Sequence, residues 1–198
     1  MKNILKLSLI VGALFFTINI SAKDRVFSIS LVDVSSKVLK FEVMNAENVS
    51  LYFYNDRKDE IYSENLGNRA IVEKTYDLST LSTGEYFLVA ESEFKIEKYR
   101  VTIDKDGNVK AEKTPVLALN KPKYTIENNI VKLYMNNVEN GVNVSISDLA
   151  NNEYYNQTVN TKNGEINLKF DFNANNSPAY VISVTKDGAV FNRMITLK

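Results

Sequence analysis

Apolar and polar residues alternate along most of the chain after residue 22. In "VLKFEVMN" (residues 38–45) and "VNVSISD" (residues 142–148), every second residue is apolar. A period of two places successive side chains on opposite faces of a β-strand. We count about seven such segments in each half of the chain and find no helical period after residue 22. The pattern therefore predicts an all-β protein.

The two halves of the sequence resemble each other. Shifting the chain by about 92 to 94 residues aligns "VLKFEVMN" with "IVKLYMNN", "ENVSLYFYND" with "ENGVNVSISD", and "RVTI" with "MITL". Seven short strands per copy are typical of an immunoglobulin-like or fibronectin-like antiparallel β-sandwich. We therefore predict one sandwich over residues 23–112 and a second over residues 122–198. Residues 113–121 form the predicted linker, and its apolar "PVLAL" is expected to pack at the junction.

The second copy decides the phase of one ambiguous strand. "LYFY" (residues 51–54) is apolar on both faces, so alternation alone does not show which face is buried. Its counterpart, "VSIS" (residues 144–147), has apolar residues at alternate positions only. The comparison predicts that Leu51 and Phe53 point into the core and that Tyr52 and Tyr54 point outward.

The first 22 residues have the pattern of a secretory signal peptide. Lys2 and Lys6 precede an apolar run over residues 7–18, and Ser21 and Ala22 supply small residues for cleavage. The run is shorter than the roughly 20 residues that a membrane-spanning helix needs. We expect export to the periplasm, the cell surface or the medium, with no stable membrane insertion after cleavage.

A Leu, a Gly and a Tyr precede one apolar strand of the first copy, in "LSTGEYFLVA" (residues 81–90). In immunoglobulin-like sandwiches, a Tyr at this place bonds through its hydroxyl to the backbone a few residues upstream. We expect Leu81 to close the end of the core, Gly84 to permit a tight turn, and Tyr86 to fix the corner. Tyr180 is the counterpart of Tyr86 in the second copy. These roles are structural.

These residues carry a family resemblance. "VSLYFYNDRKDEIYSENL", "YDLSTLSTGEYFLVAES" and "KYRVTI" of the first copy resemble the immunoglobulin-like C-terminal sorting domains of type IX secretion cargo. The second copy, residues 122–198, resembles them more weakly. The resemblance implies β-sandwich modules. It also implies, as an alternative function, that the second copy is an address read by outer-membrane secretion machinery.

Composition excludes several kinds of chemistry. The chain has no His and no Cys, so it lacks an imidazole base, a thiolate nucleophile and the usual zinc or copper ligands. We expect no catalysis, cofactor or metal site. A glycan hydrolase that uses two carboxylates is the less favoured alternative. "DKDGNV" (residues 104–109) has some character of a calcium loop, but the Asp-Gly pair favours a turn.

The remaining signs of function are outward aromatic residues and a balanced charge. The full chain has 24 basic and 24 acidic residues, and the loss of Lys2 and Lys6 leaves a net charge of −2. No basic cluster supports a nucleic-acid partner. Tyr52, Tyr54 and Tyr62 form a candidate aromatic patch for a protein or a glycan. The sequence therefore predicts an exported, non-catalytic protein that acts by surface contact.

Overall fold

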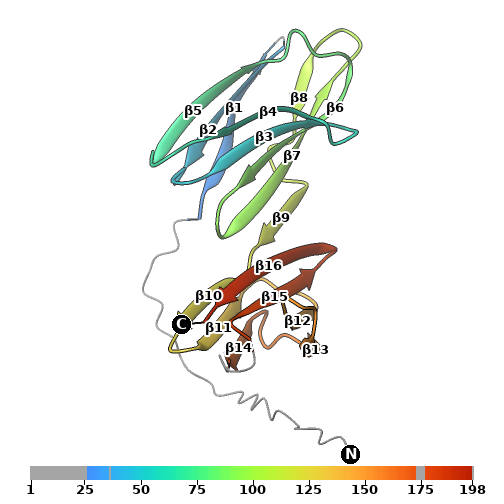
Figure 1. Cartoon of the computed structure of the whole chain (residues 1–198). Coiled ribbons are helices and arrows are strands. Elements are labelled where there is room, and N and C mark those ends of the chain that lie inside the picture. The colour runs from blue at the N-terminus through green and yellow to red at the C-terminus, as the bar shows by residue number, and fades with distance from the viewer. Residues whose placement is uncertain (1–25, 36, 173–176, 198) are drawn as a thin grey trace, which may run out of the picture. The chain divides into compact units, whose positions relative to one another are not determined.

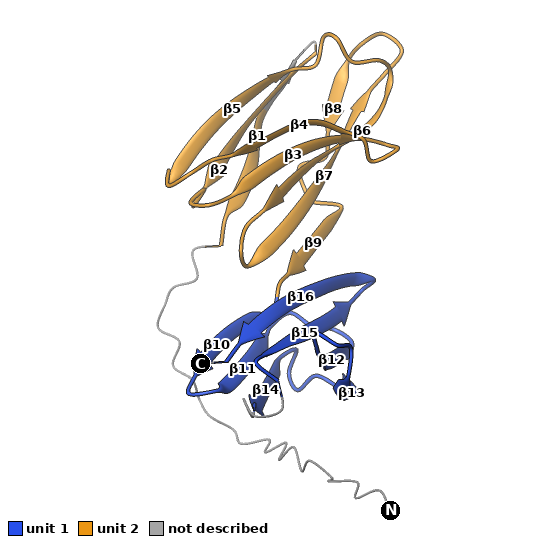
Figure 2. Ribbon diagram, in the orientation of Figure 1, with its two compact units in different colours: residues 1–19, 122–198 blue, residues 20–121 orange. Residues whose placement is uncertain are grey.

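The computed structural model describes residues 26–35, 37–172 and 177–197, and every element within these ranges is a strand or a loop (Figure 1). The predicted signal peptide lies outside these ranges. Within them, no helix has the length and apolar character needed to cross a bilayer. The chain divides into two compact units, and the division in the sequence lies between Lys121 and Pro122 (Figure 2).

The first unit has two antiparallel sheets. One sheet has the order β1-β2-β5, with β1 at Ser28–Ser35, β2 at Val38–Met44 and β5 at Ile71–Asp77. The other has the order β4-β3-β6-β7-β8, and β9 also pairs with β7. Its strands are β3 (Ser50–Asn55), β4 (Glu60–Asn65), β6 (Gly84–Glu91), β7 (Lys95–Ile103), β8 (Val109–Ala111) and β9 (Leu117–Asn120).

The second unit repeats this order in its two antiparallel sheets, and its described residues form no counterparts of β8 and β9. One sheet is β10-β11-β14, with β10 at Lys123–Glu127, β11 at Ile130–Met135 and β14 at Ile166–Asp171. The other is β13-β12-β15-β16. Its strands are β12 (Val142–Asp148), β13 (Glu153–Val159), β15 (Ala179–Lys186) and β16 (Ala189–Thr196). The protein is thus all-β, with two tandem immunoglobulin-like sandwiches of the fibronectin-like order, as the sequence predicted.

Strand registers place the aligned residues of the two units at matching positions. In the first unit, Phe53 pairs with Leu88, Tyr86 with Val101 and Phe41 with Lys74. At the matching positions of the second unit, Ile146 pairs with Ile182, Tyr180 with Ile195 and Leu133 with Leu168. Each second-unit residue is the one that the internal sequence comparison aligns with its first-unit counterpart. A residue of one unit can therefore be compared directly with its equivalent in the other.

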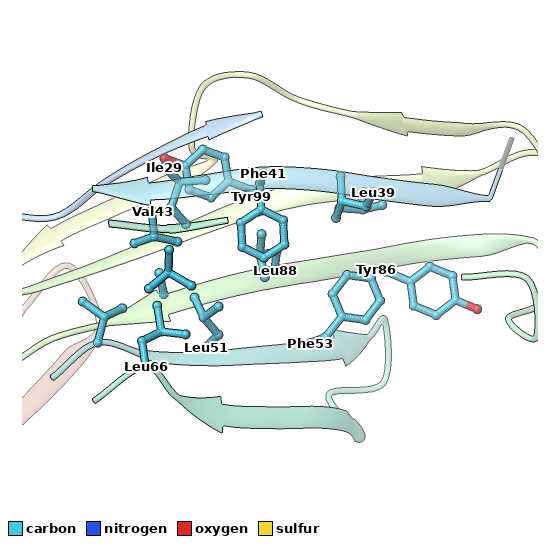
Figure 3. Close-up of a cluster of buried hydrophobic side chains, with 14 of the residues drawn as sticks. Ile29, Leu39, Phe41, Val43, Leu51, Phe53, Leu66, Tyr86, Leu88 and Tyr99 are labelled. Atoms are coloured by element: carbon cyan, nitrogen blue, oxygen red, sulfur yellow. The ribbon is translucent and has the colours of Figure 1, made fainter. Parts of the chain in front are cut away.

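Apolar side chains from both sheets fill the core of the first unit. Leu39, Phe41 and Val43 of β2 are buried, as are Leu51 and Phe53 of β3. Figure 3 shows side chains of both strands among the labelled members of one buried cluster. The predicted phase of β3 is confirmed, because the two side chains expected to point inward are 0% and 2% exposed.

Residues 113–121 were predicted to form a linker, but part of this segment is a strand of the first unit. Residues Leu117–Asn120 form β9, which pairs with β7 so that Leu119 lies opposite Ile96. The side chain of Leu119 is only 6% exposed. The edge of β7 presents backbone groups that need hydrogen-bond partners, and this segment supplies them. It therefore belongs to the first unit.

Candidate functional site

The three tyrosines of the predicted patch do not share one face. Tyr62 lies directly opposite Phe53 in the β3–β4 register, and opposed residues of an antiparallel pair point to the same side. Phe53 points into the core, so Tyr62 faces the interior side of the sheet, while Tyr52 and Tyr54 face outward. A register shift between Phe53 and Tyr54 accompanies this arrangement. The predicted patch is therefore wrong in its third member.

The outer face of the β3-β6-β7 sheet carries a cluster of aromatic side chains. Tyr52 and Tyr54 stack with ring centroids 5.9 Å apart and an interplanar angle of 18°. Tyr54 lies opposite Phe87 on β6. The Nζ atom of Lys98 lies 3.6 Å from the centroid of the Phe87 ring, which is a cation–π contact. We call these four residues the aromatic face.

Charged side chains border the aromatic face. Arg100 lies opposite Phe87 in the β6–β7 register. Its Nε atom is 2.5 Å from Oε1 of Glu85, and its Nη1 atom is 3.2 Å from Oε1 of Glu112. All three side chains are between 42% and 45% exposed, so solvent screens these pairs and they add little to stability. Arg100 nevertheless places its charge next to Phe87, the residue opposite it on β6.

The equivalent face of the second unit is different in chemistry. Ser145 and Ser147 stand where the first unit has Tyr52 and Tyr54, because each pair occupies the same place in the strand registers. Val181 and Asn192 replace Phe87 and Lys98 in the same way. In the second unit, the hydroxyl of Ser183 donates to Oδ1 of Asn192 at 2.7 Å. The same fold is thus built here with smaller, mostly polar residues, so the aromatic face is not a requirement of the sandwich.

Phe87 and Lys98 are the members of the site that the sequence reasoning missed. Alternation contained a signal for Phe87, because Tyr86 was expected to point inward and its neighbour must then point outward. Lys98 has no such signal. Its contact with Phe87 depends on the register between β6 and β7, in which Lys98 lies opposite Val89.

The corner residues occupy places close to those predicted. The hydroxyl of Tyr86 donates a hydrogen bond to the backbone oxygen of Ser82 at 2.8 Å. Leu81 packs against the core cluster from its edge. In the second unit, Tyr180 is buried, and its ring lies 4.6 Å from that of Phe172. Burial raises the pKa of Tyr180, and a backbone hydrogen bond at Ser177 opposes that shift.

Gly84 departs from the sequence expectation. Its φ angle lies outside the left-handed region, so the backbone there does not require glycine. A Cβ atom at this position would lie 3.7 Å from the nearest atom of the Tyr86 ring, an ordinary van der Waals distance. Gly84 is the first residue of β6 and follows the turn, which explains the difference.

The carboxylate of Asp104 accepts hydrogen bonds from groups of its own turn. Oδ1 of Asp104 accepts from the backbone N–H groups of Asp106 and Asn108, and Oδ2 accepts from the Asn108 side chain. Hydrogen bonds from Asn108 hold the pKa of Asp104 below its usual value. "DKDGNV" thus forms a turn closed by its own groups. Among the described residues, no group of three or more Asp and Glu side chains is arranged to hold a metal ion.

No family model matches the chain, and no curated protein matches it. Among solved structures, native α2-macroglobulin from Escherichia coli, spanning domains MG0-NIE-MG1, has 13% identity and a TM-score of 0.27. Bovine butyrophilin has 8% identity and a TM-score of 0.26. The β-glucuronidase from Ruminococcus gnavus has 13% identity and a TM-score of 0.24.

The matched regions differ in extent. They cover 87% of this chain for α2-macroglobulin and for butyrophilin, and 82% for the glucuronidase. They cover 64% of the α2-macroglobulin chain, 99% of the butyrophilin chain and 36% of the glucuronidase chain. This chain therefore spans less than two thirds of the α2-macroglobulin chain.

Proposed function

We propose that this protein is an exported, non-catalytic binding protein whose first unit holds a protein partner through the aromatic face. The proposal rests on the difference between the two units at equivalent positions. Tyr52, Tyr54, Phe87 and Lys98 occupy positions that the second unit fills with Ser145, Ser147, Val181 and Asn192. A role other than folding explains why the first unit has large rings there.

A protein partner fits this surface better than a small molecule does. The face is formed by the middle strands of a sheet, and such a surface is broad. Tyr and Arg are among the residues that most often carry the binding energy at the centre of protein interfaces. Glu85, Arg100 and Glu112 supply a charged border, which resembles the polar rim of such interfaces. The partner is expected to present an apolar or aromatic patch with charged neighbours.

Export rests on the sequence of residues 1–22. Their basic start, apolar run and small residues before the cut form the pattern of a signal peptide. The type IX resemblance adds a second proposal, in which residues 122–198 act as a sorting address. A chain truncated after residue 121 tests this second proposal. An address predicts that only the truncated chain stays in the periplasm, and a shared compartment for both chains would contradict it.

Photo-crosslinking in the cells that produce the protein tests the binding role. A photoreactive phenylalanine replaces Val89, which lies opposite both Tyr52 and Lys98. The matched control carries the same group at Ser183, the equivalent position in the second unit. We expect a protein crosslink from position 89 alone. A titration with the purified partner should then show binding.

A variant that gives the first unit the residues of the second completes the test. Tyr52→Ser, Tyr54→Ser and Phe87→Val are combined, and we expect both the crosslink and the binding to be lost. The control combines Ser145→Ala with Ser147→Ala and should bind normally. Binding that survives the aromatic replacements would refute the role of this face. A crosslink to polysaccharide would show that the partner of the aromatic face is a glycan and not a protein.

A further inference from the structure

A groove lies between the two sheets of the first unit, where β4 and β5 form the edges of their sheets. Its volume is about 430 Å³. Residues of both strands line it, together with part of the loop that follows β5. It lies on the interior side of β4, so it is separate from the aromatic face on the outer side of the same sheet.

One wall of the groove is aromatic. Tyr62 from β4 is 44% exposed, and its ring meets the ring of Tyr76 from β5 edge to face, with centroids 5.2 Å apart. Tyr76 also makes an edge contact with Phe53, at 6.0 Å. The inner ring is therefore fixed by the core, and the outer ring remains open to a ligand.

A charged pair lies beside this wall. The ammonium group of Lys74 contacts Oε2 of Glu64, and the hydroxyl of Tyr76 donates to Oε1 of the same carboxylate at 3.3 Å. The side chains of Lys74 and Glu64 are only 21% and 17% exposed. Burial, followed by the charge of Glu64, raises the pKa of Tyr76, so its hydroxyl stays protonated as a donor.

The second unit shows that the fold does not need this pair. Tyr155 takes the place of Tyr62 and makes the same kind of edge contact with Phe170, at 5.4 Å, but it is only 8% exposed. Gln157 and Leu168 stand in place of Glu64 and Lys74. Apolar packing usually stabilises such a position as well as a partly buried ion pair does. Because folding does not need the charged pair of the first unit, a role in binding explains its presence.

The chemistry of the lining narrows the class of ligand. Two carboxylates, Glu64 and Asp77, and the ammonium of Lys74 give the groove a net charge of −1. Lys74 and Glu64 are already paired with each other, so neither group offers an unpaired charge to an ionic ligand. A neutral molecule with hydroxyl groups can accept from the ammonium and donate to the carboxylate beside it. Its C–H face can lie against the exposed ring of Tyr62.

We infer that this groove is a binding site for one ring of a neutral saccharide. The Tyr62 ring packs against the sugar, while Glu64 and Lys74 bind neighbouring hydroxyl groups. Thr75 and Thr80 also line the groove. This site is independent of the protein partner proposed for the aromatic face.

Amide chemical shifts of the full chain test the inference. The probes are cellotetraose, laminaritetraose, mannotetraose and chitotetraose, each titrated to about 10 mM. One sugar ring has about twelve heavy atoms, and the binding free energy per heavy atom that is typical of drug-sized ligands then gives a millimolar Kd. We expect at least one probe to shift the amides of Tyr62, Glu64 and Lys74 together. Two variants separate binding from folding. Glu64→Gln with Lys74→Leu copies the second unit, and Tyr62→Ala removes the wall without touching the charged pair.

The double variant should weaken binding at least about tenfold, the loss expected when hydrogen bonds to charged groups are removed. Tyr62→Ala should weaken it about two- to tenfold, the loss expected for an aromatic contact. The control, Tyr54→Ser on the aromatic face, should bind as the wild type does. The absence of shifts with every probe would overturn the inference. Shifts that gather on Tyr52 and Tyr54 would also overturn it and would place the saccharide on the outer face.

Discussion

The hydroxyl of Tyr86 donates a hydrogen bond to the backbone oxygen of Ser82, four residues upstream, at 2.8 Å. The ring of Tyr86 stacks on Phe53 in the core, with centroids 5.7 Å apart, and Figure 3 shows its oxygen pointing away from Phe53. A single side chain thus joins the core to the loop that precedes β6.

Tyr86→Phe keeps the ring and removes this hydrogen bond, together with a longer contact of 3.5 Å between the hydroxyls of Tyr86 and Ser82. We expect the free energy of unfolding to fall by about 1 kcal/mol, because the backbone oxygen of Ser82 loses its partner in a partly buried site. Urea unfolding of the full chain measures the change. Tyr54→Phe, at a half-exposed position, is the control and should differ from wild type by less than about 0.5 kcal/mol. Equal stability of the Tyr86 variant and the wild type would contradict a structural role for the corner.

The outer and inner positions of β3 should respond very differently to truncation. Tyr54→Ser removes a half-buried ring, and we expect a loss of about 0.5–1 kcal/mol. Phe53→Ala empties part of the core one residue away and should cost about 3–5 kcal/mol. Thermal unfolding of both variants measures the difference. Comparable losses would show that the aromatic face is needed for folding, and this would remove the main support for its binding role.

The charged pair in the groove should be strongly coupled. Lys74→Leu alone leaves Glu64 partly buried without its cation, so we expect a loss of about 1–2 kcal/mol. Adding Glu64→Gln removes the unpaired charge, and the double variant should return to within about 1 kcal/mol of the wild type. A double-mutant cycle by urea unfolding measures this coupling. Additive losses would show that the two side chains do not act as a pair.

Stability should fall in alkali, because several buried tyrosines resist ionisation in the folded state. Burial and the hydrogen bond to Glu97 raise the pKa of Tyr99, and burial raises the pKa of Tyr124 to about 12. Unfolded tyrosines ionise near pH 10. Above that pH the unfolded chain releases protons that the folded chain keeps, so stability is complete below about pH 10 and decreases as the pH rises.

The pH dependence can be assigned to a single residue. Between about pH 10 and 12, each such tyrosine lowers stability by about 1.4 kcal/mol per pH unit. Urea unfolding of the wild type and of Tyr99→Phe at several alkaline pH values measures the slope. The variant should show a shallower slope, whatever its stability at neutral pH. An unchanged slope would mean that Tyr99 ionises equally in both states.

Much of the fold could be predicted from the sequence by itself. A period of two indicates strands, and two copies of one pattern resolve the phase of Leu51 and Phe53, because a position that is apolar in both copies faces the core. Tyr86 could be placed at a corner because its spacing from Leu81 is local. Such features depend on a few neighbouring residues, and the sequence contains them directly.

Only the tertiary structure decided which side chains meet. Tyr62 turned away from Tyr52 and Tyr54, because the β3–β4 register places it opposite Phe53, whose side chain points into the core. Phe87 meets Lys98 across two strands, and Glu64 meets Lys74 across two sheets. These contacts depend on register and on the packing of the sheets, and the period of two is the same for every register. The sequence therefore determined the strands and their buried faces, while the aromatic face and the groove depend on how those strands pair and pack.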